Sequence, residues 1–378
     1  MKHIIRQFQI LGDFISSTRY GSGHINETYK VTVSMSGQTI LYLLQKINHN
    51  VFKEPSRVQE NILRVTRHVA SKLDINDTDA SRKTLTLVPT LDNKPVYHDP
   101  DGNWWRIYLF ITKAQTYDMI KNDEQAFLVG KAFADFQNQL ADLPAPRLNE
   151  TIPFFHNTVK RFESFQAALQ ADAFNRAKDV KPEIAFLEKR AAQCSRLLDL
   201  QAKGLIPERI THNDTKLNNV MLDDATGQGI CVIDLDTVMP GLAHYDFGDM
   251  CRSGTAATPE DERDLSKVKS RIDMFKAIAN GYCSAAKFLT KPEQAELAFS
   301  ARLITMTIAI RFLTDYLSGD TYFRTSRPNQ NLDRCRVQQK MVLSMEAQSD
   351  EMEKIVQEAL TNNLERYEFV RQEGISLR

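Results

Sequence analysis

The first third of the chain alternates short apolar segments with turn-forming residues, which is the pattern of an antiparallel sheet. Strands are expected where β-branched and aromatic residues gather, at residues 28–33, 39–47, 85–88 and 104–111. The segment Ser34–Gly37 favours a hairpin turn between the first two of these strands. Residues 55–73 instead carry apolar side chains at helical spacing, and Pro55 suits the first turn of a helix. A sheet with one helix is therefore predicted here.

The spacing of apolar residues becomes helical after Thr112. Long helical segments are expected at residues 125–139, 182–202, 298–317 and 336–362. No stretch rich in Gly, Ser or Pro separates this region from the strand-rich one, so we expect two lobes in contact and not two tethered domains. The predicted fold class is α+β and bilobal, with a small β-rich N-terminal lobe at residues 1–115 and a larger, mostly helical lobe at residues 116–378.

The amino-acid composition limits the classes of binding partner that can be expected. The 378 residues include 48 Lys and Arg and 48 Asp and Glu, and this balance gives no basic excess for binding nucleic acid or an anionic membrane. The N-terminal segment has only short apolar pieces, so neither a signal peptide nor a membrane span is expected. Five widely spaced cysteines without a C-x-x-C pair favour reduced thiols in a cytoplasmic protein. Monomer and dimer both stay open.

The segment 211–240 (THNDTKLNNVMLDDATGQGICVIDLDTVMP) carries the candidate chemistry. His212, Asp214 and Asn219 form an H-x-D-x-x-x-x-N array. An ionised carboxylate such as Asp214 can accept the proton of an acceptor hydroxyl, and a carboxamide such as Asn219 offers a neutral oxygen to Mg²⁺. Two short strands joined by a turn follow, and the second ends in Asp234-Leu235-Asp236. Phosphoryl transfer from ATP requires these parts, so Mg²⁺-dependent phosphotransfer is predicted.

A glycine-containing turn near the N-terminus is the candidate phosphate loop. Gly21, Ser22 and Gly23 precede the predicted hairpin, and paired glycines let backbone N–H groups approach phosphate oxygens. A side chain that contacts the phosphates is expected on the second strand of that hairpin. Gln45 and Lys46 are the two candidates, and because neighbouring residues of a strand face opposite ways, only one of them can face the nucleotide.

Several longer blocks of sequence resemble the aminoglycoside phosphotransferase and choline kinase family, whose members have the bilobal protein-kinase-like fold. The matching blocks are GHIN at 23–26, YLLQKIN at 42–48, FADFQN at 133–138, HNDTKLNN at 212–219, IDLDTVMPG at 233–241, DFGD at 246–249, RFLTDY at 311–316 and GDTYF at 319–323. Within that family the sequence is most similar to N-acetylhexosamine 1-kinases. The resemblance implies transfer of the ATP γ-phosphate to the anomeric hydroxyl of GlcNAc or GalNAc, with Mg²⁺ as the metal.

The resemblance also implies roles for single residues. Asp214 corresponds to the catalytic base, and the positions of metal ligands correspond to Asn219 and Asp234, with Asp236 assisting. The positions that hold the sugar correspond to His24, Ile25, Asn26, Arg311 and Tyr322. His212 and Asp246 are expected to hold the catalytic loop in place. Three of these assignments have a structural alternative. Arg311 could pair with Asp315 one helical turn later, Tyr322 could be ordinary packing, and Asp246 could be a plain helix N-cap.

The function has two alternatives. One is a kinase that acts on a different acceptor, and the other is a nucleotide-binding protein that catalyses no reaction. A choline or ethanolamine acceptor would need an aromatic cage, to which Tyr316, Tyr322 and Phe323 could contribute. Homoserine is a further candidate, while a polycationic aminoglycoside would need an acidic face, and the C-terminal region mixes arginines among its acids. A nucleotide-binding regulator would have no need of the complete set of catalytic and metal-binding residues.

Overall fold

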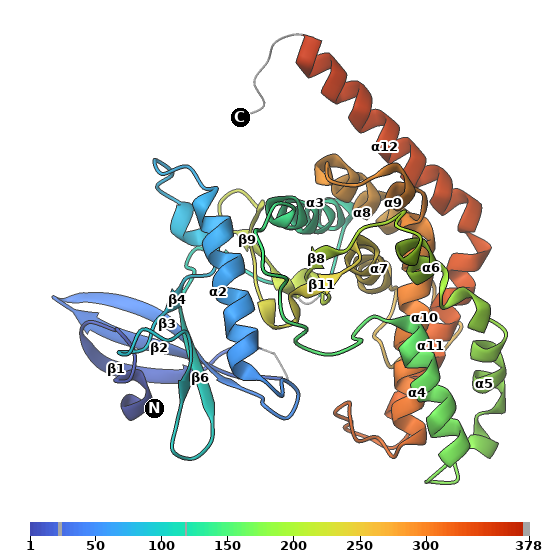
Figure 1. Ribbon diagram of the computed structural model, residues 1–378, viewed down its shortest axis with the longest axis horizontal. Coiled ribbons are helices and arrows are strands. Elements are labelled where there is room, and N and C mark those ends of the chain that lie inside the picture. The colour runs from blue at the N-terminus through green and yellow to red at the C-terminus, as the bar shows by residue number, and fades with distance from the viewer. Residues whose placement is uncertain (22–24, 118, 373–378) are drawn as a thin grey trace. The chain divides into compact units, whose positions relative to one another are not determined.

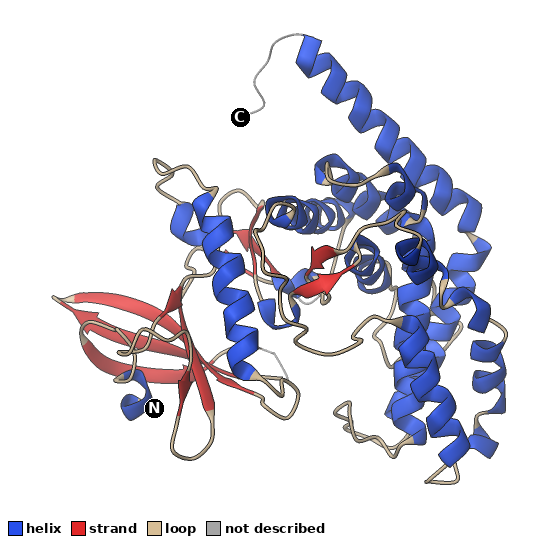
Figure 2. Ribbon diagram, in the orientation of Figure 1, coloured by secondary structure: helices blue, strands red, loops and turns tan. Residues whose placement is uncertain are grey.

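A computed structural model describes residues 1–21, 25–117 and 119–372 (Figure 1). The chain forms two compact units. The first, which we call the sheet unit, consists of Met1–Thr116, Asp142–Pro153 and Asn219–Pro240. The second, the helical unit, consists of Tyr117–Ala141, Phe154–Asn218 and Gly241–Arg378. The mixed α+β class predicted from the sequence is confirmed (Figure 2). The predicted lobes, 1–115 and 116–378, stay a prediction, and two later segments of the chain return to the sheet unit.

The main sheet of the sheet unit is antiparallel. Its strands follow the order β1 (Asp13–Arg19), β2 (Glu27–Met35), β3 (Gln38–Ile47), β6 (Trp104–Leu109) and β4 (Leu87–Val88), and β5 (Tyr97–His98) also pairs with β6. Ser36 and Gly37 have φ angles of 52° and 80°, so they form the two-residue turn that favours a β2–β3 hairpin. The register places Gln45 opposite both Thr28 and Arg106. One face of the sheet can therefore bring these polar side chains together.

The opposite face of this sheet is apolar. Alternate residues of β2, β3 and β6 form a buried cluster with the N-terminal helix α1 (Lys2–Ile5) and Phe8: Ile4, Ile5, Val31, Val33, Tyr42, Leu44, Trp105 and Ile107. The two-residue period of a strand explains the separation, because Leu44 and Gln45 must face opposite sides. The apolar face is thus covered inside the sheet unit itself.

Within the sheet unit, helix α2 (Pro55–Ser71) contacts both later segments of the chain, Asp142–Pro153 and Asn219–Pro240. Its apolar side buries Val58, Ile62 and Val65. Asn61, which is fully buried, donates through Nδ2 to the carbonyl oxygens of Asn149 at 2.8 Å and Val238 at 2.9 Å. Both returning segments are therefore held by one amide side chain.

A second, smaller sheet in the same unit contains the hairpin that leads from Asn219 to Asp234. It consists of β7 (Ala114–Gln115), β9 (Val220–Asp223) and β10 (Gly229–Val232), with β9 in the middle. The backbone N–H of Ile233 donates to the carbonyl of Asn219 at 2.9 Å and closes the β9–β10 hairpin. The hairpin expected from the sequence is confirmed, and its open end joins Asn219 to the residue before Asp234.

The helical unit is built from longer helices. They are α3 (Asp123–Leu140), α4 (Thr158–Ala171), α5 (Lys181–Glu188), α6 (Arg196–Ala202), α7 (Ala243–Gly254), α8 (Ile272–Ala285), α9 (Lys291–Ala295), α10 (Leu297–Leu317), α11 (Gln330–Ala347) and α12 (Ser349–Gln372). Two short strands are β8 (Arg209–Thr211) and β11 (Met239–Gly241), which runs across the boundary of the units. The 3₁₀ turns are η1 (Ala80–Arg82), η2 (Ala177–Asp179), η3 (Ala191–Gln193), η4 (Leu217–Asn219) and η5 (Leu235–Thr237).

Two helix predictions are wrong, because the structure divides each of these segments into two helices. The helix expected at 182–202 is divided into α5 and α6, since Arg190 turns inward and pairs with Glu346 of α11 at 2.6 Å. The helix expected at 336–362 is divided at Gln348, whose side chain donates to the carbonyl of Ser270 at 3.2 Å. In both places tertiary contacts override a continuous helical pattern.

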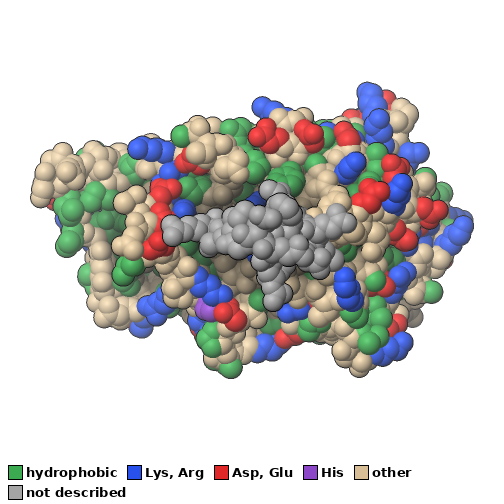
Figure 3. All heavy atoms as spheres, turned by 90° about the horizontal axis from the view of Figure 1, so that it is seen from above, with side chains coloured by type: hydrophobic (Ala, Val, Ile, Leu, Met, Phe, Trp, Pro, Cys, Tyr) green, Lys and Arg blue, Asp and Glu red, His purple; other side chains and the backbone are tan. Residues whose placement is uncertain are grey.

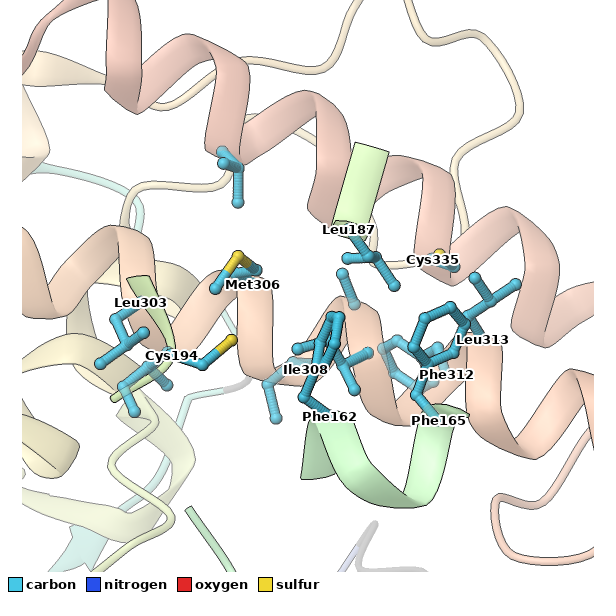
Figure 4. Packing of buried hydrophobic residues seen from close by; sticks show 14 of the residues in the cluster. Phe162, Phe165, Leu187, Cys194, Leu303, Met306, Ile308, Phe312, Leu313 and Cys335 are labelled. Atoms are coloured by element: carbon cyan, nitrogen blue, oxygen red, sulfur yellow. The ribbon is translucent and has the colours of Figure 1, made fainter. Parts of the chain in front are cut away.

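Helix α10 is the centre of the helical unit. Phe162 and Phe165 point from α4 into a buried cluster with Ile308, Phe312 and other side chains of α10 (Figure 4). By length and composition α10 could cross a membrane, but 83% of its apolar window is buried inside the protein, as in a core helix. On the face of the protein shown in Figure 3, basic and acidic side chains are interspersed, as the equal numbers of the two would suggest.

Helices α3 and α8 cross at two glycines. A Cβ added to Gly281 would lie 2.0 Å from the carbonyl oxygen of Phe127, and one added to Gly130 would lie 2.3 Å from that of Ile278. Both obstacles are backbone atoms, so a side chain at either position must push the helices apart.

We therefore expect Gly281→Ala to lower the free energy of unfolding by about 1–3 kcal/mol, despite the better helix propensity of alanine. Urea unfolding followed by circular dichroism measures this change. Asn280→Ala, on the same helix but only half-buried, is the matched control and is expected to be close to neutral. A Gly281→Ala protein as stable as this control would contradict the close approach of the two helices.

Candidate functional site

Side chains of helix α7 hold the loop that carries Asp214 through hydrogen bonds. The carboxylate of Asp246 accepts hydrogen bonds from the backbone N–H groups of His212 at 2.8 Å and Asn213 at 2.7 Å. The N–H of Thr215 donates to Asp249 at 2.9 Å, and its hydroxyl donates to the carbonyl of Asp246 at 2.7 Å. Backbone on both sides of Asp214 is thus fixed by two consecutive turns of one helix.

Asp246 lies in a fully buried polar network. It accepts a third hydrogen bond from Nε2 of Gln137 at 2.7 Å, and the hydroxyl of Tyr282 donates to Oε1 of Gln137 at 2.5 Å. Burial raises the pKa of Asp246 to about 6, although its N–H donors favour the ionised form. At neutral pH the carboxylate is therefore charged, which strengthens the hydrogen bonds that hold the loop.

Asp214 and its neighbours form the reactive part of this loop. The N–H of Asp214 donates to Nδ1 of His212 at 3.3 Å, and the His212 ring is buried against Phe133 and Phe136. The Asp214 carboxylate is partly exposed and pairs with the ammonium of Lys216 at 3.0 Å. Lys216 is not among the residues expected from the sequence, although its place two residues after Asp214 in HNDTK was a usable signal.

Asn219 and Asp234 are the two residues whose chemistry fits Mg²⁺. They lie at the same end of the β9–β10 hairpin, because Val220 pairs with Val232 and Asn219 bonds to Ile233. Asp234 has a left-handed backbone, with φ of 60° and ψ of 53°, and is exposed. One carboxylate and one carboxamide oxygen, completed by phosphates and water, are a typical set of ligands for this ion.

Asp236 has a different environment. Its carboxylate forms a bidentate ion pair with Arg106 of β6, in which Nη2 lies 2.9 Å from Oδ2, and Nδ2 of Asn26 donates to the same oxygen at 2.6 Å. Arg106 is 1% and Asp236 2% exposed. Burial alone would lower the pKa of Arg106, but the carboxylate of Asp236 more than offsets this and raises it. Because both oxygens of Asp236 are engaged inside the protein, we propose Asn219 and Asp234 alone as metal ligands.

The same network contains Gln45 but not Lys46. Oε1 of Gln45 accepts from Nε of Arg106 at 2.8 Å, and its Nε2 donates to Thr28 at 3.0 Å. The ammonium of Lys46 lies 5.9 Å from the ring of Trp105. Gln45 is therefore the one of the two that lies on the side of Asp236. A buried arginine inside the apolar strand WWRIYL was a signal for this network that we did not use, because a buried charge needs a partner.

The candidate phosphate loop is described only at its edges. Ser22, Gly23 and His24 lie outside the described residues. Gly21 has a φ of 78° and open space at its Cβ position, and Ile25 is exposed. Asn26, expected at the acceptor, accepts a hydrogen bond from the N–H of Asn48 at 2.9 Å and donates to Asp236.

Arg311 and Tyr322 come together in the helical unit. The Arg311 guanidinium faces three aromatic rings, Phe155 at 4.7 Å, Phe323 at 5.3 Å and Tyr322 at 5.5 Å, and its Nη2 donates to the Tyr322 hydroxyl at 3.3 Å. Asp315 is not its partner, since this carboxylate accepts from the backbone N–H groups of residues 321–323. Tyr322 is 54% exposed and therefore is not core packing.

This aromatic cluster is connected to the catalytic loop. His156, the neighbour of Phe155, bonds through Nε2 to the carbonyl of Asn213 at 2.9 Å, directly before Asp214. The contact lies wholly within the helical unit. Arg311 is thus linked to Asp214 through Phe155, His156 and the carbonyl of Asn213.

Together the fold and these residues define a kinase-like phosphotransferase. The model of the phosphotransferase enzyme family known as APH matches residues 17–266, and the chain belongs to this family. The match includes the Gly21 turn, the β2–β3 hairpin, the catalytic loop and the Asp234 segment.

Solved structures with the same fold include three with a TM-score above 0.5. An aminoglycoside phosphotransferase from Alicyclobacillus acidocaldarius is 13% identical, with a TM-score of 0.58 over 92% of this chain and 95% of that one. A Plasmodium vivax ethanolamine kinase is 15% identical, with a TM-score of 0.51 over 84% and 80%. The ADP-bound aminoglycoside phosphotransferase of type 2''-Ib is 13% identical, with a TM-score of 0.51 over 91% and 97%. At these identities the likeness shows the protein-kinase-like fold.

Removing one member of the buried ion pair tests its structural role. We expect Arg106→Met to lower the free energy of unfolding by about 3–5 kcal/mol, because Asp236 is left as an uncompensated buried charge. The double replacement Arg106→Met with Asp236→Leu should recover much of this loss. Arg57→Met, which breaks an exposed pair with Glu54, should cost less than about 1 kcal/mol in the same urea titration. Equal effects of Arg106→Met and Arg57→Met would contradict a buried pair.

The buried His156 predicts a loss of stability in acid. Burial lowers its pKa from 6.5 to about 4, and Arg311 and Arg252 add to this while Asp249 opposes it. The unfolded chain therefore binds the proton first, so stability is complete above about pH 6.5 and falls by on the order of 3 kcal/mol as the pH drops towards 4.

We expect His156→Gln to lose this part of the pH dependence in thermal or urea unfolding between pH 4 and 7. His49→Gln changes an exposed histidine and serves as the control. The depressed pKa of the buried His244 affects all three proteins alike and cancels from the comparison. An unchanged pH slope in His156→Gln would show that folding leaves the pKa of His156 near its ordinary value.

Proposed function

We propose that this protein is a Mg²⁺-dependent small-molecule kinase that transfers the γ-phosphate of ATP to the anomeric hydroxyl of an N-acetylhexosamine, GlcNAc or GalNAc. The family supports phosphotransfer to an alcohol. The observation that carries the choice of acceptor is the half-buried Arg311, which faces aromatic rings beside the catalytic loop. A guanidinium can donate to sugar hydroxyls and to the N-acetyl carbonyl, and an aromatic face can pack against a sugar ring.

In this proposal each part of the site has one task. Asp214 orients the acceptor hydroxyl and accepts its proton, and Lys216 offers a positive charge to the phosphoryl group in transfer. Asn219 and Asp234 hold Mg²⁺, which neutralises charge on the phosphates when it is bound. The network of Arg106, Asp236 and Gln45 keeps the Asp234 segment in place.

A cationic acceptor such as choline is less well supported. The aromatic residues that could form a cage already face guanidinium groups: Tyr316 faces Arg176 at 4.6 Å, and Tyr322 and Phe323 face Arg311. A second cation would have to approach these rings against like charge. A nucleotide-binding regulator that catalyses no reaction would not need a catalytic loop held in place by buried carboxylates.

The direct test is ATP- and Mg²⁺-dependent phosphorylation of a panel of GlcNAc, GalNAc, glucose, galactose, choline and kanamycin. ³¹P and ¹H NMR locate the new phosphate. A product phosphorylated at C1 of an N-acetylhexosamine is the expected result. Phosphorylation of choline or kanamycin would overturn the proposed acceptor and keep phosphotransfer, whereas bound ATP without transfer to any alcohol would favour the regulator.

The role of Asp214 predicts a selective loss of turnover. Asp214→Asn removes the proton acceptor and is expected to lower kcat by roughly 10³-fold or more, while ATP affinity, measured by calorimetry, changes little. Asp224→Asn makes the same change at an exposed position of the β9–β10 turn and should leave kcat intact. Loss of ATP binding in a folded Asp214→Asn protein would instead assign Asp214 to the nucleotide.

A further inference from the structure

A second arginine lies beside the Arg311 cluster. Arg161 is on α4, next to Phe162, and Arg311 is on α10, next to Phe312; these two helices pack together through the core shown in Figure 4. Nε of Arg161 donates to the carbonyl of Phe155 at 3.1 Å, and the ring of the same Phe155 faces Arg311 at 4.7 Å. One residue therefore contacts both guanidinium groups.

Both arginines lack a carboxylate partner within the described residues. Arg161 bonds to a backbone carbonyl, and Arg311 to a tyrosine hydroxyl and aromatic rings. Several other arginines of the helical unit are paired with a carboxylate, as in Arg176–Asp320, Arg190–Glu346 and Arg336–Glu183. Arg302 of α10 also has no carboxylate partner among the described residues, so it is the shared contact with Phe155 that sets Arg161 and Arg311 apart. The carboxylate nearest in sequence on α10, Asp315, is already occupied by backbone N–H groups and Asn331.

The two positive charges act on each other. Burial, and next the charge of Arg311, lower the pKa of Arg161 to about 10, so that both groups are still charged at neutral pH. Two like charges in a partly buried place raise the free energy of the protein unless a ligand supplies hydrogen-bond acceptors. Such an arrangement is unfavourable for folding alone, which points to a binding role.

The position of the pair connects it to the proposed chemistry. Phe155 touches both arginines, and the adjacent His156 holds the carbonyl of Asn213 at the start of the catalytic loop. The subsite therefore requires a ligand that contacts these guanidiniums and also presents a hydroxyl to Asp214. This ligand must carry oxygen acceptors and must not carry a positive charge.

We propose that Arg161 and Arg311 form a paired guanidinium subsite that binds the acceptor through its oxygen atoms and rejects acceptors with a positive charge. The proposal rests on the proposed function and adds Arg161 as a residue that determines specificity. The matching chemistry is a carbonyl or carboxylate oxygen, as in the amide of an N-acetyl sugar or the carboxylate of a sugar acid. Amino sugars, choline and aminoglycosides are excluded by charge.

GlcNAc and glucosamine test the subsite because they differ in an amide and an ammonium group on the same ring. We would measure kcat/KM for both, and for glucuronic acid, at slightly acidic pH in wild type, Arg161→Gln, Arg161→Lys and Lys160→Met. In Arg161→Gln, kcat/KM for GlcNAc should fall about tenfold to hundredfold, mainly through KM. The preference for GlcNAc over glucosamine should fall at least about tenfold, because repulsion of the amine is reduced.

The other variants separate charge from structure. Arg161→Lys keeps the charge and should retain most of the preference for GlcNAc, whereas Lys160→Met removes an exposed charge on the same helix and should behave as wild type. Melting temperature and ATP affinity of Arg161→Gln should match those of Lys160→Met. An unfolded Arg161→Gln would transfer the test to Arg161→Lys with GlcNAc, where a KM equal to that of wild type would overturn a direct contact of the guanidinium with the acceptor.

The outcomes distinguish this inference from the proposed function. Turnover of GlcNAc by wild type with the same preference in Arg161→Gln would overturn the subsite and keep the function. Preference for glucuronic acid, abolished in Arg161→Gln, would support the subsite, assign a carboxylate as its ligand and overturn the N-acetyl sugar. Efficient phosphorylation of glucosamine or choline by wild type would overturn both.

Discussion

The pairing of Arg106 with Asp236 is the contact on which the sheet unit depends. Two charges have been removed from water, and only their bidentate contact and the surrounding amides of Asn26 and Gln45 offset the desolvation. Because Asp236 follows Asp234 by two residues, this pair also fixes where the proposed metal ligand leaves the hairpin. A hydrophobic pair could fill the same space, but it would not impose one geometry on the chain.

The helical unit holds the catalytic loop with two carboxylates, Asp246 and Asp249, and Asp249 is paired with Arg252. Asp246 accepts two backbone N–H groups and an amide, so its negative charge is spread over donors that would otherwise be buried without partners. The proposed metal ligands and the proposed proton acceptor are therefore each positioned by a buried anion. Asp246 holds backbone N–H groups, whereas Asp236 holds the side chains of Arg106 and Asn26.

Much of this could be predicted from the sequence. The β2–β3 and β9–β10 hairpins follow from local alternation and turn residues, and the fold class follows from the change in periodicity. The partners of buried polar residues could not be predicted in the same way. The letters IDLD do not say that Asp234 is exposed while Asp236 faces an arginine of β6, because a side-chain contact between residues 130 positions apart decides it. The breaks at Arg190 and Gln348 were missed for the same reason, since long-range contacts decide both.

The path of the chain has a consequence for how such a protein can be divided. It passes between the units at 116/117, 141/142, 153/154, 218/219 and 240/241, so neither unit is one continuous stretch of sequence. Asp214 and Asn219 stand on opposite sides of one of these crossings. Recombination with a relative at residue 116 would therefore join the main sheet of one parent to the β9–β10 hairpin of the other. Only parents that share Arg106, Asn61 and their partners could exchange these segments, which ties the inheritance of the main sheet to that of the segment that carries Asp234.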